Sequence, residues 1–117
     1  MTMPVGKIDP DKVALDRPIF EPAAFRLDDR QAAIIATARE LGQSVIAGRA
    51  ATYDREAKFP VENYKDLHRA GLLGSAIPQQ HGGLGADYQT YALAAAEIGR
   101  YCGATALTWN MHVCSTL

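Results

Sequence analysis

The histidines and cysteines are the residues of this sequence most often used for acid–base, nucleophilic or metal chemistry, but their spacing supports none of these. His68, His81 and His112 show no i, i+4 pairing, and no cysteine or carboxylate accompanies them at the spacing of a zinc ligand set. If Cys102 and Cys114 lie on one helix they are about 18 Å apart, too far for a disulfide. We therefore predict no metal site, two reduced thiols and a cytoplasmic protein.

A second candidate is the glycine-rich segment Gln79–Gly85, which precedes a helix capped by Asp87. Glycine allows backbone N–H groups to approach an anion at the start of a helix. However, the segment lacks the Gly-Lys-Ser/Thr of a P-loop, and no strand precedes it as in a G-x-G-x-x-G fingerprint. We favour a tight connection between two helices that requires positive φ values.

The third candidate is the carboxy-terminal segment, which has no Asp, Glu, Lys or Arg from Tyr101 to Leu117. A helix that is apolar on all sides is normally buried on all sides. Its Trp109, Met111 and Cys114 are typical of a core helix, yet beside Asn110 they would also suit an apolar ligand tunnel. No residue is nominated as an activated nucleophile.

About four predicted helices position these candidates, so the expected fold class is all-α. The first begins after Asp28, which has Gln31 at capping-box spacing, and continues to about Ala57, before Phe59-Pro60. Its apolar stripe repeats at 4-3-4-3-4 spacing, which favours a regular amphipathic helix. The stripe consists of Ile34, Ala38, Leu41, Val45, Gly48 and Thr52, widened by Ile35 and Ile46.

The other three helices are shorter. The second spans about Val61 to Ala70 and ends at Gly71. The third follows Asp87, and the fourth covers Ala104 to Leu117. The predicted apolar face of the third consists of Tyr88, Tyr91, Ala92, Ala95 and Ile98. Residues 1–27 contain four of the six prolines and are predicted to form an extended arm before the helical domain, residues 28–117.

Composition narrows the function classes further. The net charge is −1 and the basic residues are scattered, so the sequence offers no footprint for nucleic acid. No apolar run reaches the ~18 residues that span a bilayer. The first helix would be about 42 Å long, more than the diameter of about 35 Å expected for a compact domain of this size. We therefore expect this chain to be the amino-terminal piece of a longer polypeptide.

Four segments, in order and at matching spacing, resemble the acyl-CoA dehydrogenase family over about residues 28–117. Tyr53–Pro60 (YDREAKFP) is similar to the junction after that family's first long helix. Leu67–Gly74 (LHRAGLLG) resembles its L-x-x-x-G-L-L-G segment. Ile77–Tyr88 is similar to I-P-x-x-x-G-G-x-G-x-D/S-Y, and Ala94–Arg100 resembles the E-x-I-A-R end of the next helix. The proline-rich arm has no counterpart.

The resemblance implies the amino-terminal helical domain of a flavoenzyme with a central β domain and a carboxy-terminal four-helix domain. FAD would bind between the last two, usually across a homotetramer, and supply the hydride chemistry. The reaction would be α,β-dehydrogenation of an acyl-CoA thioester, with electron-transfer flavoprotein reoxidising the cofactor. The family's catalytic carboxylate and main flavin contacts would lie beyond Leu117. No catalytic residue is therefore assigned here, Glu97 included, and this fragment alone is predicted to be inactive.

Substrate binding is the one role that the resemblance carries onto this chain. The helix with Trp109, Asn110, Met111 and Cys114 resembles the element that lines the far end of the family's acyl-chain cavity. The bulk of Trp109 and Met111 would shorten that cavity and favour a short or branched acyl group.

Two alternatives remain open. Flavin-dependent monooxygenases and nitroalkane oxidases share the same amino-terminal domain, and a fold does not choose among chemistries. A stand-alone helical interaction module is the alternative from another class. Against the module stands the uncharged last helix, which in isolation would expose apolar surface and favour aggregation.

Overall fold

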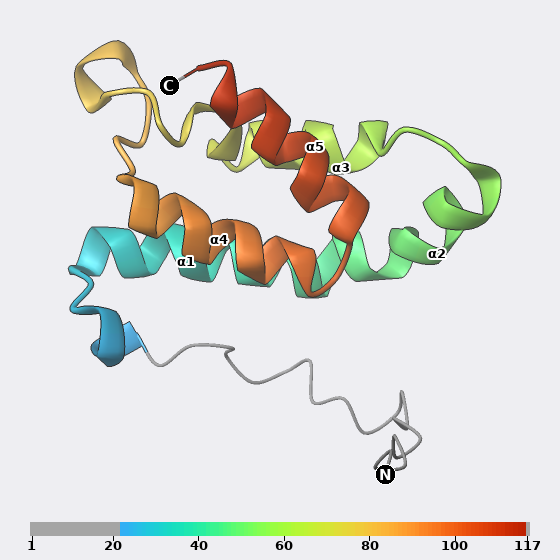
Figure 1. Ribbon diagram of the computed structural model, residues 1–117, viewed down its shortest axis with the longest axis horizontal. Helices are drawn as coiled ribbons and strands as arrows, with labels where there is room; N and C mark the ends of the chain where they lie inside the picture. Colours follow the sequence, from blue (N-terminus) through green and yellow to red (C-terminus); the bar gives the residue numbers. More distant parts are fainter. Residues whose placement is uncertain (1–21, 117) are drawn as a thin grey trace, which may run out of the picture.

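A computed structural model describes residues 22–116, and within that range the chain is all-α and forms no strand (Figure 1). A long first helix lies along one side, α4 runs beside its first half, and α5 crosses from the end of α4 toward α3. The helices are α1 (Asp29–Leu41), α2 (Ala47–Glu56), α3 (Val61–Arg69), α4 (Tyr88–Gly99) and α5 (Gly103–Cys114). Because α1 and α2 join through a helical segment, they count as one long helix, and the expectation of about four helices is confirmed.

The long helix begins where the capping signal predicts. The backbone N–H of Gln31 donates to Asp28 Oδ1 at 2.8 Å, and the N–H of Asp28 donates to Gln31 Oε1 at 2.9 Å. This reciprocal pair satisfies two of the N–H groups left free at a helix start. At the other end Ala57 adopts a left-handed conformation (φ 51°), which ends α2 ahead of Phe59-Pro60.

In the middle of the long helix the prediction of one regular stripe is wrong. A π-helical turn, Gly42–Ile46, separates α1 from α2. Such a turn inserts one residue and rotates everything after it, so the stripe shifts by one position. Ile46, which belongs to the predicted stripe, is fully buried, whereas Gly48 and Thr52 are exposed and Ala50, which was not predicted, is partly buried.

Gly42 lies at the start of this π turn and contacts the end of α4. A Cβ atom on Gly42 would stand 2.2 Å from Cδ2 of the Tyr101 ring, and real Cβ atoms essentially never come within 3.0 Å of another heavy atom. Only glycine therefore lets the aromatic ring approach the long helix here. The contact fixes the corner between α4 and α5.

The connection from α3 to α4 contains glycines with the positive φ values that we predicted for the segment Gln79–Gly85. Gly71 (φ 78°) ends α3, and Gly82 (φ 87°) and Gly85 (φ 60°) turn the following segment. Gly83 is packed so closely that a Cβ would lie 2.0 Å from the carbonyl oxygen of Ile77. Three-residue 3-10 turns occupy Leu72–Gly74 and Gln79–His81.

The predicted face of α4 is only partly right. Asp87 caps the helix as expected, accepting a hydrogen bond from the Thr90 N–H at 2.8 Å. Tyr88 is 77% exposed and Ala92 is also exposed, although both were expected to be buried. The helix packs against α1 on one side and α5 on another, so its buried surface is wider than one stripe. Its buried residues are Thr90, Tyr91, Leu93, Ala94, Glu97 and Ile98.

Two predictions extend outside the described residues. Most of the expected arm, residues 1–27, precedes Pro22, and Pro22–Phe25 forms a short 3-10 turn. The last helix ends at Cys114, and Leu117, its predicted end, is not among the described residues. No helix between residues 22 and 116 combines the length and apolar character needed to cross a membrane.

Candidate functional site

Helix α5 has two unlike sides. Its inner side, formed by Thr105, Trp109 and Val113, is buried against α3 and α4. Leu107 and Met111 on the opposite side are 62% and 64% exposed. We call the exposed row at 3-4-3 spacing the outer face of α5. It consists of Ala104, Leu107, Met111 and Cys114.

Hydrogen bonds attach the inner side of α5 to the segment that follows α3. The indole N–H of Trp109 donates to the carbonyl oxygen of Leu72 at 3.1 Å. His112 Nε2 lies 2.9 Å from the carbonyl oxygen of Leu73, the residue after Leu72. Because a carbonyl oxygen can only accept, the imidazole N–H is the donor. The two bonds satisfy buried polar groups and fix the rotation of α5 about its axis.

A polar network fastens the amino-terminal end of α5 to α3 and α2. Asn63, fully buried, donates from Nδ2 to Thr105 Oγ1 at 2.8 Å, and Thr105 in turn donates to Cys102 Sγ at 3.1 Å. Arg49 completes the chain by donating to Asn63 Oδ1 at 3.1 Å and to the carboxylate of Asp66. The hydrogen bond from Arg49 is the main reason that the pKa of Asp66 is lowered.

Two tyrosines hold the flanks of α5. Tyr64 donates from its hydroxyl to the carbonyl oxygen of Thr108 at 2.8 Å. On the α4 side, Tyr91 donates to Asn110 Oδ1 at 2.5 Å, and its ring meets the Trp109 ring edge-on at 5.4 Å. Burial, followed by the nearby Cys114 and Tyr88, raises the pKa of Tyr91 to about 12, so the hydroxyl remains a donor at neutral pH.

The four residues predicted to bind substrate do not share one side of α5. Trp109 is fully buried and directed into the core, whereas Met111 and Cys114 lie on the outer face. Asn110 is partly buried beside Tyr91, at the edge of that face. Leu107 belongs with Met111 but was not singled out from the sequence, although the 3-4-3 spacing could have identified it.

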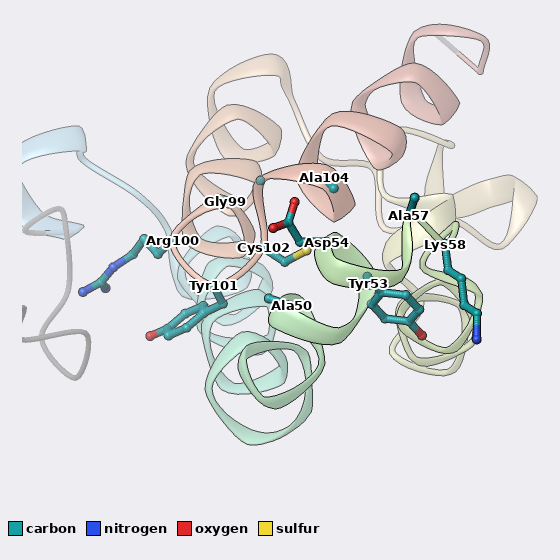
Figure 2. Close-up of a pocket in the computed structure, with 11 residues that line it drawn as sticks. Ala50, Tyr53, Asp54, Ala57, Lys58, Gly99, Arg100, Tyr101, Cys102 and Ala104 are labelled. Carbon is teal, nitrogen blue, oxygen red and sulfur yellow. The ribbon is translucent and has the colours of Figure 1, made fainter. Parts of the chain in front are cut away.

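A cavity of about 530 Å³ lies at the amino-terminal end of α5, between α2 and the corner that joins α4 to α5 (Figure 2). Asp54 and Lys58 from α2 and its end, and Cys102 at the start of α5, are among its lining residues. The Cys102 thiol is buried and already accepts the Thr105 hydroxyl. Among the described residues, the side chain of Cys102 bonds to Thr105 and that of Lys58 to Glu56. The thiol is therefore not paired with Asp54 or Lys58 as an activated nucleophile would be paired with its base.

The three histidines have different surroundings in the described part of the chain. His68 and His81 are exposed, and His112 is the partly buried histidine already described. Between residues 22 and 116 no three His, Cys, Asp or Glu side chains are grouped to hold a metal ion. Glu97 is 2% exposed, and its carboxylate lies 3.3 Å from the guanidinium of Arg100, the C-cap residue of α4, a position that suits structure more than proton transfer.

Comparison with known proteins identifies a family. Residues 28–117 match the family model described as the acyl-CoA dehydrogenase amino-terminal domain. The probable acyl-CoA dehydrogenase YngJ of Bacillus subtilis is 33% identical over 89 residues, which cover 76% of this chain and 23% of that protein. The short-chain specific acyl-CoA dehydrogenase of Clostridium acetobutylicum is 30% identical over 95 residues, covering 80% of this chain and 25% of that protein.

A relative with a different named substrate also matches. The cyclohex-1-ene-1-carbonyl-CoA dehydrogenase of Syntrophus aciditrophicus is 36% identical over 81 residues, covering 69% of this chain and 20% of that protein. The chain thus spans a fifth to a quarter of the length of these curated relatives. No solved structure matches the chain. With the family model covering residues 28–117, the chain belongs to the acyl-CoA dehydrogenase family and contains its all-α amino-terminal domain.

Proposed function

We propose that this chain is the amino-terminal part of an FAD-dependent acyl-CoA dehydrogenase that catalyses α,β-dehydrogenation of an acyl-CoA thioester. The observation that carries the proposal, beyond membership of the family, is the outer face of α5. This face is exposed, uncharged and regular, while every polar attachment of the helix described above lies behind it or at its edge. An apolar surface held this firmly suits a wall of a substrate cavity.

The contribution of the described residues is to bind and position substrate. In the family that the sequence resembles, FAD binds between the two later domains, so we propose that the flavin contacts are made by other parts of the complete enzyme. FAD, when bound, accepts the hydride removed in such a reaction. No residue described here is assigned to the accompanying proton transfer, and the fragment alone is proposed to be inactive.

The substrate-binding residues proposed are Trp109, Asn110, Met111 and Cys114, with different roles. Met111 and Cys114 are exposed and would contact the acyl chain directly. Trp109 is buried and would act indirectly, because its hydrogen bond to the carbonyl oxygen of Leu72 holds α5 in place. The exposed bulk of Met111 supports a short or branched acyl group, and relatives named for short-chain and cyclic acyl-CoA substrates are compatible with both.

Partners and compartment follow from the same proposal. We propose electron-transfer flavoprotein as the electron acceptor and a homotetramer as the assembly of the complete enzyme, since both accompany this activity in the family that the sequence resembles. A cytoplasmic location is supported by two cysteines that are both free thiols, one buried and one exposed.

The proposed function is tested on the complete polypeptide purified from its native source. We expect an intact mass several times that of the 117-residue chain, a yellow protein, and loss of the flavin absorbance near 450 nm when butanoyl-CoA is added without oxygen. A flavin that is bleached only by an external reductant and then consumes oxygen would favour the monooxygenase alternative. A mass equal to that of this chain, with no flavin, would instead favour a stand-alone helical module.

A further inference from the structure

Asn110 is a partly buried polar side chain of α5 that adjoins the outer face on the side of Tyr91 and α4. Along a helix, residues three or four apart are surface neighbours. Asn110 is therefore adjacent to Leu107 on one turn and to Cys114 on the next. A carboxamide at this position is unexpected in a wall that contacts only hydrocarbon, because each polar group that loses water there needs a partner.

Tyr91 fixes the orientation of this carboxamide. The phenol hydroxyl donates to Asn110 Oδ1, and the Tyr91 ring is itself held edge-on against buried Trp109. The backbone of Tyr91 is held within α4, whose Asp87 cap lies one turn before it. With Oδ1 engaged by a donor, the amide nitrogen Nδ2 must be on the opposite side of the group.

The Nδ2 amino group of Asn110 consequently carries two N–H donors that find no acceptor within residues 22–116. An amide nitrogen can donate but cannot accept, so a ligand group that meets it must carry an acceptor oxygen. The surrounding residues on the exposed side, Leu107, Met111 and Cys114, offer hydrocarbon and sulfur and do not compete for such an oxygen.

We propose that Asn110 is a specificity-determining residue that selects an acyl group bearing an oxygen acceptor, such as a carbonyl or hydroxyl, beyond the carbons that react. The inference rests on the proposed function, because it requires that the outer face of α5 lines the acyl cavity. It assigns Tyr91 as the positioning residue that presents the Asn110 amide. A site built around a donor rejects the plain alkyl analogue, because the donor is then left buried without a partner.

The test compares pentanoyl-CoA with 4-oxopentanoyl-CoA, and hexanoyl-CoA with 5-oxohexanoyl-CoA, on the complete flavin-loaded enzyme. The quantity measured is the ratio of kcat/KM for the oxo substrate to that for its plain partner. We expect wild type to favour one of the oxo substrates about tenfold. Asn110→Leu keeps the approximate volume but removes the donor, and should bring that ratio close to one. Tyr91→Phe should lower it about threefold, because the amide is no longer oriented.

Two further variants make the result specific. Glu40→Gln changes an exposed side chain of α1 that does not belong to the outer face of α5, and should leave the ratio as in wild type. Asn110→Asp keeps the shape but replaces the donor with a carboxylate, and should lower the ratio below one by repelling the ketone oxygen. This variant also serves if Asn110→Leu fails to fold.

The proposal is overturned if wild type shows no preference for either oxo substrate, or if the preference survives in Asn110→Leu or Asn110→Asp. Plain acyl-CoA oxidation without any oxo preference would leave the proposed function intact and refute only the role of Asn110. Failure of folded, flavin-loaded wild type to oxidise any of the four substrates would refute both.

Discussion

The two sides of α5 differ in burial: the inner side packs in the core of the domain, and the outer side is the surface proposed to contact substrate. The inner side buries Trp109 completely and ties it to the carbonyl oxygen of Leu72. The outer side leaves Leu107 and Met111 more than half exposed within residues 22–116. Both sides are uncharged in the sequence, so composition alone does not separate them. The difference lies in which residues face the neighbouring helices.

The comparison predicts that inner-side substitutions unfold the domain, whereas outer-side substitutions alter function and leave the fold intact. The physical reason is that a buried side chain loses packing and leaves a cavity when truncated, while an exposed one loses little.

Truncation of the inner side should have the largest effect. We expect Trp109→Ala to destabilise the domain by about 3–5 kcal/mol, because it removes a fully buried indole and leaves the Leu72 carbonyl without its donor. Denaturant unfolding measures the change. The matched control on the same helix is Leu107→Ala, expected to change stability by less than about 0.5 kcal/mol. Equal effects from the two variants would contradict the division of the helix.

The long helix offers a second comparison, between two of its glycines. Gly42→Ala places a methyl group 2.2 Å from the Tyr101 ring and should cost about 1–3 kcal/mol through overpacking. Gly48→Ala meets no atom within 4 Å and should stabilise the helix by about 0.5–1 kcal/mol. Thermal unfolding of both variants provides the measurement. A stabilising Gly42→Ala would mean that Tyr101 does not pack on the π turn.

The network behind α5 should give a smaller, pH-dependent effect. The folded pKa of Asp66 is lowered chiefly by its hydrogen bond with Arg49, and that of Asp87 by hydrogen bonds from Thr90. A lowered folded pKa contributes stability that is complete above the unfolded pKa, near 4, and is lost as the pH falls through the folded value.

We therefore expect stability to fall below about pH 4, with a contribution of about 1 kcal/mol from the ion pair of Asp66 and Arg49. Asp66→Asn should reduce the slope of stability against pH in this acid range, while Glu40→Gln, an exposed control, should not. Urea unfolding from pH 2 to pH 7 measures both slopes. An unchanged slope in Asp66→Asn would show that this carboxylate is not held by Arg49.

Local signals in the sequence predicted most of the fold. The reciprocal cap of Asp28 and Gln31, the Asp87 cap and the glycine turns depend on neighbouring residues, so spacing alone identifies them. The π turn could not be found in this way, because Gly42 meets Tyr101, 59 positions further along the chain. The missed turn explains why Gly48 and Thr52 were assigned to the buried stripe.

The candidate site was predicted as a helix but not as a surface. The absence of charge after Tyr101 identified α5, and Met111 and Cys114 were named from it. The inward direction of Trp109 and the attachment of Asn110 to Tyr91 are tertiary facts, since their partners Leu72 and Tyr91 lie 37 and 19 positions away. Sequence spacing does not specify which of two uncharged sides will meet them.

Met111, the exposed residue at the middle of the outer face, tests whether this face lines the acyl cavity. Met111→Ala in the complete enzyme should leave unfolding within about 0.5 kcal/mol of wild type, because the side chain is 64% exposed in this domain. It should also raise kcat/KM for hexanoyl-CoA and octanoyl-CoA relative to butanoyl-CoA, because the shorter side chain lengthens the cavity. A chain-length profile identical to that of wild type would contradict the assignment of the outer face of α5 to the acyl cavity.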